Sequence, residues 1–106
     1  MSTHHVDIVV IGLGPGGEDV AGELATAGLK VVGIEHHLVG GECPYYGCIP
    51  SKMMIRAADL IAETRRANIM SGTTTMTPDY SIVAKRIRTE ATDDWDDTVA
   101  VDRLVG

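Results

Sequence analysis

The chain has 106 residues, of which 44% are hydrophobic, and carries a formal net charge of −6 at pH 7 because 15 acidic residues outnumber 9 basic ones. These values predict one small globular domain, and the acidic balance argues against a partner such as nucleic acid or an anionic membrane surface. No apolar run approaches the roughly 20 residues that cross a bilayer, and no secretory signal opens the chain, so we expect a cytoplasmic location without a membrane partner.

The first predicted element is a β-strand. Residues 6–12 read VDIVVIG, a short run of Val and Ile that is typical of a strand buried on both faces in a parallel sheet. The turn that follows reads GLGPGG, and Gly12, Gly14 and Gly17 satisfy the pattern G-x-G-x-x-G. The pattern alone is weak evidence, so the elements around it decide its meaning.

A helix and a second strand follow the turn. The helix is expected from about residue 16 to residue 27, and Gly28 stands where a helix ends. Its expected buried stripe has the three-to-four spacing of an amphipathic helix and consists of Val20, Leu24 and Ala27. Residues 30–35, KVVGIE, form a second buried strand that ends in Glu35, 18 positions beyond Gly17.

Together these elements predict a dinucleotide site, since the glycine turn lies between a strand and a helix and an acidic residue follows at the expected distance. The first glycine makes the tight turn, the second lets the backbone approach a pyrophosphate, and the third allows the helix to pack on the strand. Free amides at the helix start bind phosphate, and Glu35 accepts hydrogen bonds from ribose hydroxyls. The ligand is therefore expected to be FAD or NAD. The candidate cofactor residues of this unit are Gly12, Gly14, Pro15, Gly16, Gly17, Glu35 and His36.

The only two cysteines, Cys43 and Cys48, are separated by four residues. Pro50 suits the first turn of a helix, which we expect to run to about Arg66, so the second cysteine lies at a helix N-terminus. The helix dipole there favours a thiolate, and Lys52 adds a positive charge. The spacing permits a disulfide that forms and breaks reversibly.

Two other readings of the cysteines compete with a redox role. They can be buried structural thiols, or they can form half of a zinc site completed by His36 and His37. Adjacent histidines tend to point in different directions, and the second ligand pair of a structural zinc site is missing from the pattern. We therefore predict no metal site.

Residues 40–52, GGECPYYGCIPSK, closely resemble GGTCxxxxCIPSK, the redox segment of the class I pyridine nucleotide-disulfide oxidoreductases. This is the flavoprotein family of dihydrolipoamide dehydrogenase, glutathione reductase and mercuric reductase, and the resemblance covers roughly residues 6–66. It implies that FAD binds at the glycine turn and Glu35, with Gly41 and Lys52 close to the cofactor. It also implies that Cys48 is the thiolate facing the flavin, that Cys43 exchanges with the acceptor, and that Lys52 lies beside the flavin N5.

The segment departs from the family pattern in two ways. Glu42 replaces the usual threonine and brings a carboxylate near the thiols, which favours raised thiol pKa values. Tyr45 and Tyr46 either line the approach of the substrate or simply pack. These differences leave the reaction type standing but leave open whether the acceptor is a disulfide, a quinone or another small molecule.

The second half of the chain carries weaker signals. An apolar stripe in the cysteine helix is expected to make core contacts and consists of Met54, Ala57, Ala58 and Ile61. Residues 71–77 read SGTTTMT and predict an exposed loop. A further helix is expected over about residues 79–103, with a stripe at four-residue spacing: Val83, Ile87, Ala91, Trp95 and Val99. Trp95 is expected to anchor the core. Four acidic residues around it are read as a solvated helix face rather than as a metal or catalytic site: Asp93, Asp94, Asp96 and Asp97.

The predicted fold class is α/β, with a Rossmann-like FAD-binding βαβ unit of parallel strands over residues 6–35. A redox-dithiol helix over 43–66 and a helix over about 79–103 complete it. Because two buried strands need neighbours on both sides, residues 1–106 are expected to be the N-terminal part of a larger doubly wound domain. The domain that binds NAD(P)H and the interface domain would lie outside this chain.

The predicted function is that of an FAD-dependent oxidoreductase, homodimeric at full length. Electrons would pass from NAD(P)H through FAD to the Cys43–Cys48 disulfide and on to a small-molecule or disulfide substrate. Three alternatives stay open: a truncated FAD- or NAD-binding module without turnover of its own, a quinone-type reductase, and a fragment of an NAD-binding dehydrogenase in which the cysteines are incidental.

Overall fold

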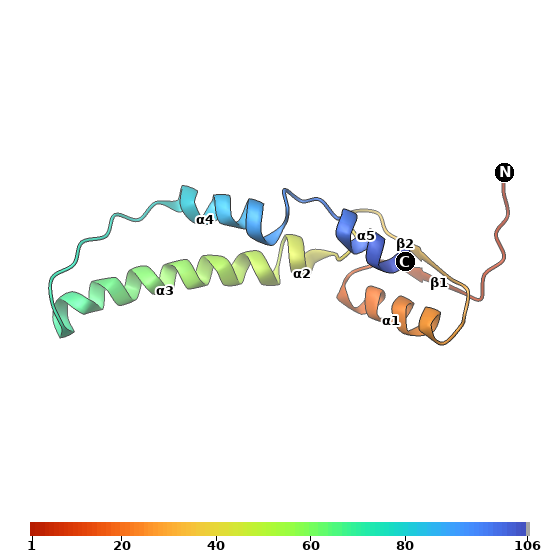
Figure 1. The fold of residues 1–106 in the computed structure, drawn as a ribbon, viewed down its shortest axis with the longest axis horizontal. Coiled ribbons are helices and arrows are strands. Elements are labelled where there is room, and N and C mark those ends of the chain that lie inside the picture. Colours follow the sequence, from red (N-terminus) through yellow and green to blue (C-terminus); the bar gives the residue numbers. More distant parts are fainter. Residues whose placement is uncertain (106) are drawn as a thin grey trace.

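The structure is a computed structural model that describes residues 1–105. Its elements in chain order are β1 (Ile8–Ile11), α1 (Pro15–Thr26), β2 (Val31–Ile34), α2 (Glu42–Tyr45), α3 (Cys48–Met70), α4 (Tyr80–Arg86), the π-helix η1 (Ile87–Ala91) and α5 (Thr98–Val105). The molecule is elongated, with extents of 68 × 26 × 19 Å. Figure 1 shows a head built from β1, α1, β2 and α5, from which an arm formed by α3 and α4 extends. No helix within residues 1–105 is both long and apolar enough to span a membrane.

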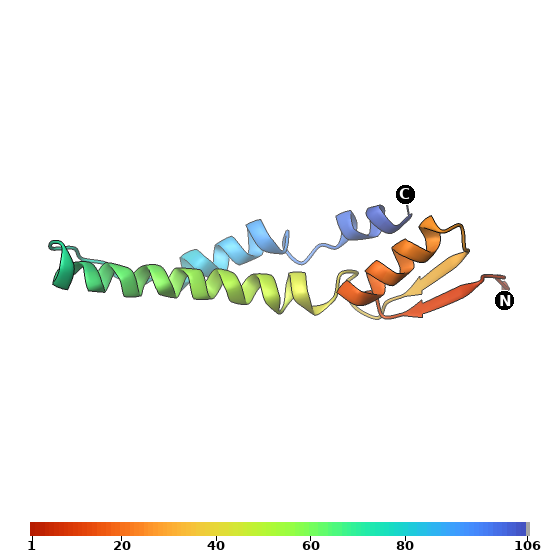
Figure 2. The ribbon, with the colours of Figure 1, turned by 90° about the horizontal axis from the view of Figure 1, so that it is seen from below.

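The head contains the predicted βαβ unit. Strands β1 and β2 pair in parallel, with Ile8 opposite Val31 and Ile11 opposite Ile34. Helix α1 connects them and lies on one side of the strand pair (Figure 2). It ends at Thr26, one residue before the predicted end, and Gly28 follows with a φ of 93°, a conformation that glycine adopts at little cost. The α/β class and the parallel strands are thus confirmed.

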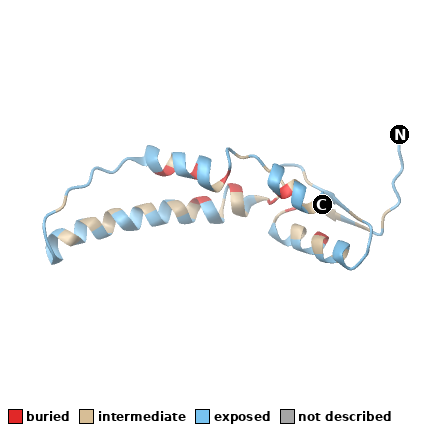
Figure 3. Ribbon diagram, in the orientation of Figure 1, coloured by how far each residue is buried: buried red, intermediate tan, exposed pale blue. Residues whose placement is uncertain are grey.

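The strands are at most half-buried, and on one face only, so the prediction of burial on both faces is wrong. Alternate residues of β1 are exposed, and Figure 3 colours the two strands as exposed and intermediate. Ile11 is 84% exposed and Ile34 is 52% exposed. The reason is that the sheet has two strands and, among the described residues, a helical layer on one side only. The run of apolar residues shows that both faces of the strands can be buried, but residues 1–105 provide a helical layer on one face only.

Helix α1 also buries a different residue from those predicted. Its buried residue is Ala21, whereas Val20 and Ala27 are exposed and Leu24 is half-buried. Gly17 approaches the strand most closely, and a residue four positions later lies on the same helix face. Ala21 therefore faces the sheet, and the predicted stripe of Val20, Leu24 and Ala27 is rotated away from it.

The predicted dithiol helix over 43–66 is two helices. The four-residue helix α2 carries Cys43, and α3 begins at Cys48. The break occurs because the amides of Tyr46 and Gly47 both donate to the carbonyl of Glu42, at 2.8 and 2.6 Å, which closes the first helix. Helix α3 then runs to Met70, four residues past the predicted end, and residues 71–77 form the predicted loop.

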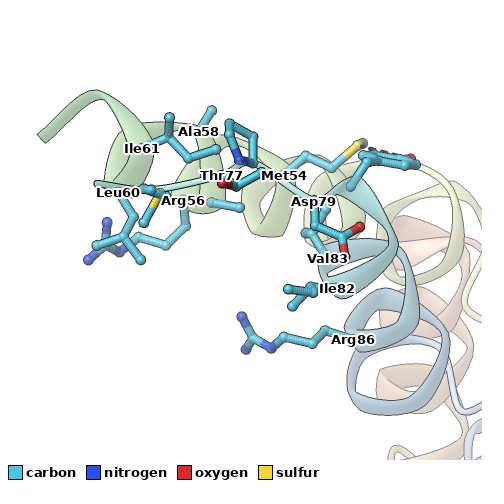
Figure 4. Close-up of a pocket in the computed structure, with 14 residues that line it drawn as sticks. Met54, Arg56, Ala58, Leu60, Ile61, Thr77, Asp79, Ile82, Val83 and Arg86 are labelled. Atoms are coloured by element: carbon cyan, nitrogen blue, oxygen red, sulfur yellow. Dashed lines mark hydrogen bonds between the residues drawn. The ribbon is translucent and has the colours of Figure 1, made fainter. Parts of the chain in front are cut away.

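The apolar stripe of α3 lines an open groove rather than a packed core. Met54, Ala57, Ala58 and Ile61 face a hollow of about 610 Å³ between α3 and the segment that begins α4. Figure 4 shows Met54 and Ile61 from α3 and Ile82 and Val83 from α4 around it, with Arg56 and Arg86 at its edge. Val83 is buried, but Met54 is exposed, so the expected core contact is only partly made.

The single helix predicted over 79–103 is wrong. Asp79 caps α4 as expected, accepting the amide of Ser81 at 2.9 Å. The helix then widens into η1 and stops, because Asp93, Asp94 and Trp95 have left-handed φ values of 47°, 57° and 58°. The chain turns there and re-enters the head as α5. Val83 and Ile87 of the predicted stripe are buried, but Val99, beyond the turn, is exposed.

Candidate functional site

The glycine turn, residues 12–17, joins β1 to α1 through close backbone contact. Gly12 has a φ of 90° and donates its amide to the carbonyl of Ile34 at 2.8 Å. A Cβ on Gly17 would lie 1.9 Å from the carbonyl oxygen of Gly12, which no side chain tolerates. The amides of Gly14, Gly16 and Gly17 donate to no group within residues 1–105. They form a set of free donors at a helix N-terminus, the arrangement that binds phosphate.

Glu35 follows β2 and turns its carboxylate back onto the glycine turn. Oε2 accepts the amide of Leu13 at 2.7 Å, and Oε1 accepts the amides of His36 and His37 at 2.7 and 2.9 Å. These hydrogen bonds, with that of His37 first, lower the pKa of Glu35 below its ordinary value of 4.5. The carboxylate is therefore charged at neutral pH. A carboxylate offers about four acceptor positions, so ribose hydroxyls would share or replace some of these amide contacts.

The segment that carries the cysteines is in direct backbone contact with the glycine turn. Gly40 donates its amide to the carbonyl of Leu13 at 2.7 Å. Gly41 has a φ of 73°, and a Cβ at this residue would lie 2.7 Å from the Cα of Gly14. The two motifs that the sequence presents about 25 residues apart are therefore in backbone contact in the fold.

A hollow of about 590 Å³ opens where these pieces meet, within the range of roughly 300–1,000 Å³ typical of ligand pockets. Its lining residues are Gly14, Pro15, Glu35, His37, Leu38, Gly41, Glu42 and Tyr46. Four predicted cofactor residues thus share one hollow. The predicted residues Gly12, Gly16, Gly17, His36 and Lys52 do not line it.

His37 and Leu38 line this hollow but were not predicted. The sequence placed both histidines beside the adenosine site but named only His36 as a cofactor residue. In the structure the centroids of the two rings lie 4.4 Å apart with the ring planes tilted by 60°, and only His37 lines the hollow. The sequence alone does not show which of the two adjacent histidines lines the hollow, since this depends on how the chain turns after β2.

Cys43 and Cys48 are both free, the first half-buried in α2 and the second exposed at the first turn of α3. The pKa of Cys43 is raised first by its hydrogen bond with Cys48 and then by burial, and Lys52 opposes this increase by its charge. The exposure of Cys48 argues against a pair of buried structural thiols. The largest causes of the raised Cys43 pKa are thus Cys48 and burial, rather than the Glu42 carboxylate that the sequence suggested.

The acidic residues near Trp95 lie in a turn rather than on a solvated helix face, so that prediction is corrected. Asp97 accepts the amide of Val39 at 2.7 Å, and Asp96 accepts the amide of Thr98 at 2.8 Å. Trp95 donates its Nε1 hydrogen to the carbonyl of Tyr45 at 3.1 Å. Within residues 1–105, no three His, Cys, Asp or Glu side chains are grouped so that they could hold a metal ion. The contacts of Asp97 and Trp95 join segments about 50 residues apart and have no local sequence signal.

A parallel βαβ unit whose glycine turn has free amides, followed by a helix-borne pair of thiols, defines a Rossmann-like α/β unit. Comparison with known families agrees, because the family described as pyridine nucleotide-disulphide oxidoreductase matches residues 6–105. The chain belongs to this family.

Individual relatives are enzymes of two kinds. The dihydrolipoyl dehydrogenase of Mycobacterium tuberculosis is 40% identical over 85 residues, which are 79% of this chain and 18% of that protein. The dihydrolipoyl dehydrogenase of Zymomonas mobilis is 38% identical over 78 residues, 74% of this chain and 16% of that protein. A soluble pyridine nucleotide transhydrogenase of Vibrio vulnificus is 49% identical over 61 residues, 57% of this chain and 13% of that protein. The matched part of the chain thus spans less than a fifth of each of these relatives.

Proposed function

We propose that the chain is the FAD-binding and redox-dithiol part of a flavin-dependent oxidoreductase. The single observation that carries the proposal is the backbone contact between Gly41 and Gly14, because it sets the cysteine segment against the turn that would hold the diphosphate. The enzyme would take electrons from NAD(P)H, bound by a domain outside this chain, and pass them to a disulfide or another small acceptor. A homodimeric, cytoplasmic full-length enzyme without nucleic-acid or membrane partners belongs to the same proposal.

The residues present fit the adenosine diphosphate half of FAD. The free amides of Gly14, Gly16 and Gly17 would bind the diphosphate, and Glu35 would accept the ribose hydroxyls. The negative charge of Glu35 would disfavour a 2′-phosphate at the same place. Pro15 and Gly41, which lie next to each other at the hollow, would border the diphosphate, while Gly12 would shape the turn and His36 would lie next to the adenosine. Bound FAD would supply the two-electron chemistry that connects NAD(P)H to the Cys43–Cys48 disulfide.

The reduced dithiol would then act on the acceptor. With a disulfide acceptor, the Cys43 sulfur would attack one substrate sulfur and release the other as a thiol. The Cys48 sulfur would then attack the Cys43 sulfur of this mixed disulfide, which forms the Cys43–Cys48 bond and releases the second substrate sulfur as a thiol. Two electrons and two protons pass from the dithiol to the substrate. Cys48 opens α3, and a helix N-terminus favours a thiolate, which supports the assignment of the flavin-facing sulfur to Cys48; Lys52, one helical turn further along α3, would stabilise that charge.

Titration of the chain with FAD, followed by quenching of flavin fluorescence, tests the cofactor. We expect FAD to bind and the variant Glu35→Ala to weaken binding, because the ribose acceptor is lost. Binding of NAD with no binding of FAD would contradict the proposal and favour the dehydrogenase fragment.

An assay of NADH oxidation with FAD and a disulfide or quinone acceptor tests the remaining alternatives. We expect no turnover by residues 1–106 alone, because the proposal places the reductant site in another domain. Turnover by this chain equal to that of a full-length enzyme would contradict that division. In the full-length enzyme, the preferred acceptor then separates disulfide reduction from quinone reduction.

A further inference from the structure

The dithiol segment, residues 39–48, is held at two points by a turn that lies about 50 residues later in the chain. Asp97 Oδ2 accepts the amide of Val39 at 2.7 Å. Trp95 donates its indole hydrogen to the carbonyl of Tyr45 at 3.1 Å. Both contacts are partly buried, and they lie on either side of Cys43. We call Trp95 and Asp97 the clamp.

The turn that presents the clamp has an unusual conformation that its own contacts maintain. Asp93, Asp94 and Trp95 are consecutive left-handed residues, an arrangement that costs free energy and persists only where the surroundings impose it. Thr92, only 1% exposed, accepts the amide of Trp95 at 3.3 Å and donates its hydroxyl to the carbonyl of Arg88 at 3.1 Å. The amide of Asp94 donates to the same carbonyl at 2.7 Å. These hydrogen bonds hold the turn that carries the clamp in one conformation. The turn follows directly after η1, and π-helical turns often occur at functional sites.

The clamp and the glycine turn hold the dithiol segment from opposite directions. The amide of Gly40 donates a hydrogen bond to the carbonyl of Leu13 at the glycine turn, and the amide of the adjacent Val39 donates one to the carboxylate of Asp97. Tyr45, which follows Cys43 by two residues, is buried and bonded to Trp95. The backbone on both sides of Cys43 is therefore held in part by side chains that belong to neither the glycine turn nor the cysteine motif.

We propose that Trp95 and Asp97 are positioning residues for the redox dithiol, holding Cys43 where its sulfur meets that of Cys48. This inference rests on the proposed function, since it assumes that the two thiols cycle through a disulfide. Both residues form their hydrogen bonds with the backbone of the dithiol segment and act on the sulfurs through it.

The test is the equilibrium between dithiol and disulfide in mixtures of oxidised and reduced glutathione. In this exchange the two protein thiols give two electrons and two protons to oxidised glutathione, so that one Cys43–Cys48 bond forms and two molecules of glutathione are released. Trapping the thiols with an alkylating reagent and weighing the chain by mass spectrometry gives the fraction oxidised, and with it the equilibrium constant. Far-ultraviolet circular dichroism of each variant checks that the fold is retained.

Four variants divide the contacts. Asp97→Ala removes the acceptor for the Val39 amide, and Trp95→Phe keeps an aromatic ring but removes the indole donor. We expect each to lower the equilibrium constant for disulfide formation by about fivefold, because a lost hydrogen bond lets the Cys43 segment move. Asp97→Asn keeps an acceptor oxygen and should stay close to the parent. Asp93→Asn, in the same turn but without a side-chain contact, is the matched control and should also match the parent.

The outcomes separate the two proposals. If the parent chain forms no Cys43–Cys48 disulfide at any glutathione ratio, the dithiol function itself fails. If the parent forms it and the folded Asp97→Ala and Trp95→Phe variants have the parental constant, the clamp is refuted, even where they unfold more easily. An equal loss in Asp97→Asn or Asp93→Asn would also refute it. If Asp97→Ala fails to fold, the proposal is tested by comparing the equilibrium constant of Trp95→Phe with that of Asp93→Asn.

Discussion

At the scale of single residues, Gly17 shows how a motif glycine is required by packing. A Cβ at this position would meet the Gly12 carbonyl oxygen at 1.9 Å and its carbon at 2.9 Å. Both atoms belong to the backbone, so neither can rotate away. Gly16, the preceding residue in the same helix, has no atom within 4 Å of its Cβ position. Of two adjacent glycines in one pattern, packing therefore requires glycine at position 17 but not at position 16.

The variant Gly17→Ala should therefore destabilise the fold by about 1–3 kcal/mol, the usual cost of forcing extra volume into a packed contact. Gly16→Ala should be neutral or slightly stabilising, because alanine favours a helix and meets open space. Urea unfolding followed by circular dichroism measures both. Equal effects of the two substitutions would show that the contact at Gly17 relaxes without cost.

Glu35 is a second residue whose role depends on backbone contacts. Its carboxylate accepts three amides, and their hydrogen bonds hold its pKa below 4.5. A carboxyl group with a lowered pKa in the folded state stabilises the fold fully above its unfolded value, and this contribution disappears as the pH falls through the folded value.

The variant Glu35→Gln should accordingly be less stable than the parent at neutral pH, and the difference should shrink as the pH falls below 4.5, the ordinary value for this group. Denaturant unfolding at a series of pH values measures it. Glu63→Gln is the control, because Glu63 is an exposed residue of α3 with a single distant ion pair to Arg66. A stability gap for Glu35→Gln that is unchanged at acid pH would contradict this account.

At the scale of elements, the informative case is the interruption between η1 and α5. The four-residue spacing of apolar side chains continues across it, yet the backbone turns at three left-handed residues. Aspartate tolerates this conformation better than most residues because its short polar side chain can bond locally. The aspartates around Trp95 therefore have a conformational use that their charge does not reveal.

Substitution at Asp93 tests this interpretation, since its side chain is exposed and makes no hydrogen bond or ion pair within residues 1–105. Asp93→Val should destabilise the protein by about 1–2 kcal/mol, because a β-branched residue is disfavoured in the left-handed region. Asp93→Gly should stay within about 0.5 kcal/mol of the parent, since glycine adopts this conformation freely but gains entropy when unfolded. Thermal and urea unfolding report both, and equal stability of the two variants would argue against a backbone requirement.

At the scale of the whole molecule, the outstanding feature is an apolar sheet face that nothing within residues 1–105 covers. Four side chains alternate along the two strands and point away from α1: Val9, Ile11, Val32 and Ile34. The parallel register places Val9 beside Val32 and Ile11 beside Ile34, so they form one continuous patch. Contiguous apolar patches mark surfaces that bind other groups.

The chain of residues 1–106 should therefore bind the apolar dye ANS and associate at high concentration. Replacing both Ile11 and Ile34 by Thr should reduce dye fluorescence and association, because threonine keeps the β-branched shape but removes apolar surface. Ile69→Thr, at the far end of α3 and about as exposed as Ile11, is the control and should have little effect. Dye fluorescence and analytical ultracentrifugation measure the two properties; an equal response to Ile69→Thr would mean that the sheet face is not the binding surface.

The sequence by itself determined the local units of this protein. Strand, glycine turn, helix and second strand follow from short apolar runs, from a helical pattern of period 3.6 and from glycines with backbone requirements, so β1, α1 and β2 were predictable, and so was the start of α3 near Cys48. The resemblance of residues 40–52 to a known redox segment indicated the family that residues 6–105 belong to.

Only the tertiary structure decided which of these units meet and which faces are covered. The contact of Gly41 with Gly14, the placement of His37 rather than His36 at the hollow, and the clamp of Trp95 and Asp97 on the dithiol segment all join residues that share no local pattern. The same is true of the turn that divides the predicted helix over 79–103. Periodicity reports what a segment can bury and where it can bend, but the partner that it meets depends on how distant segments pack, and that information is spread over the whole chain.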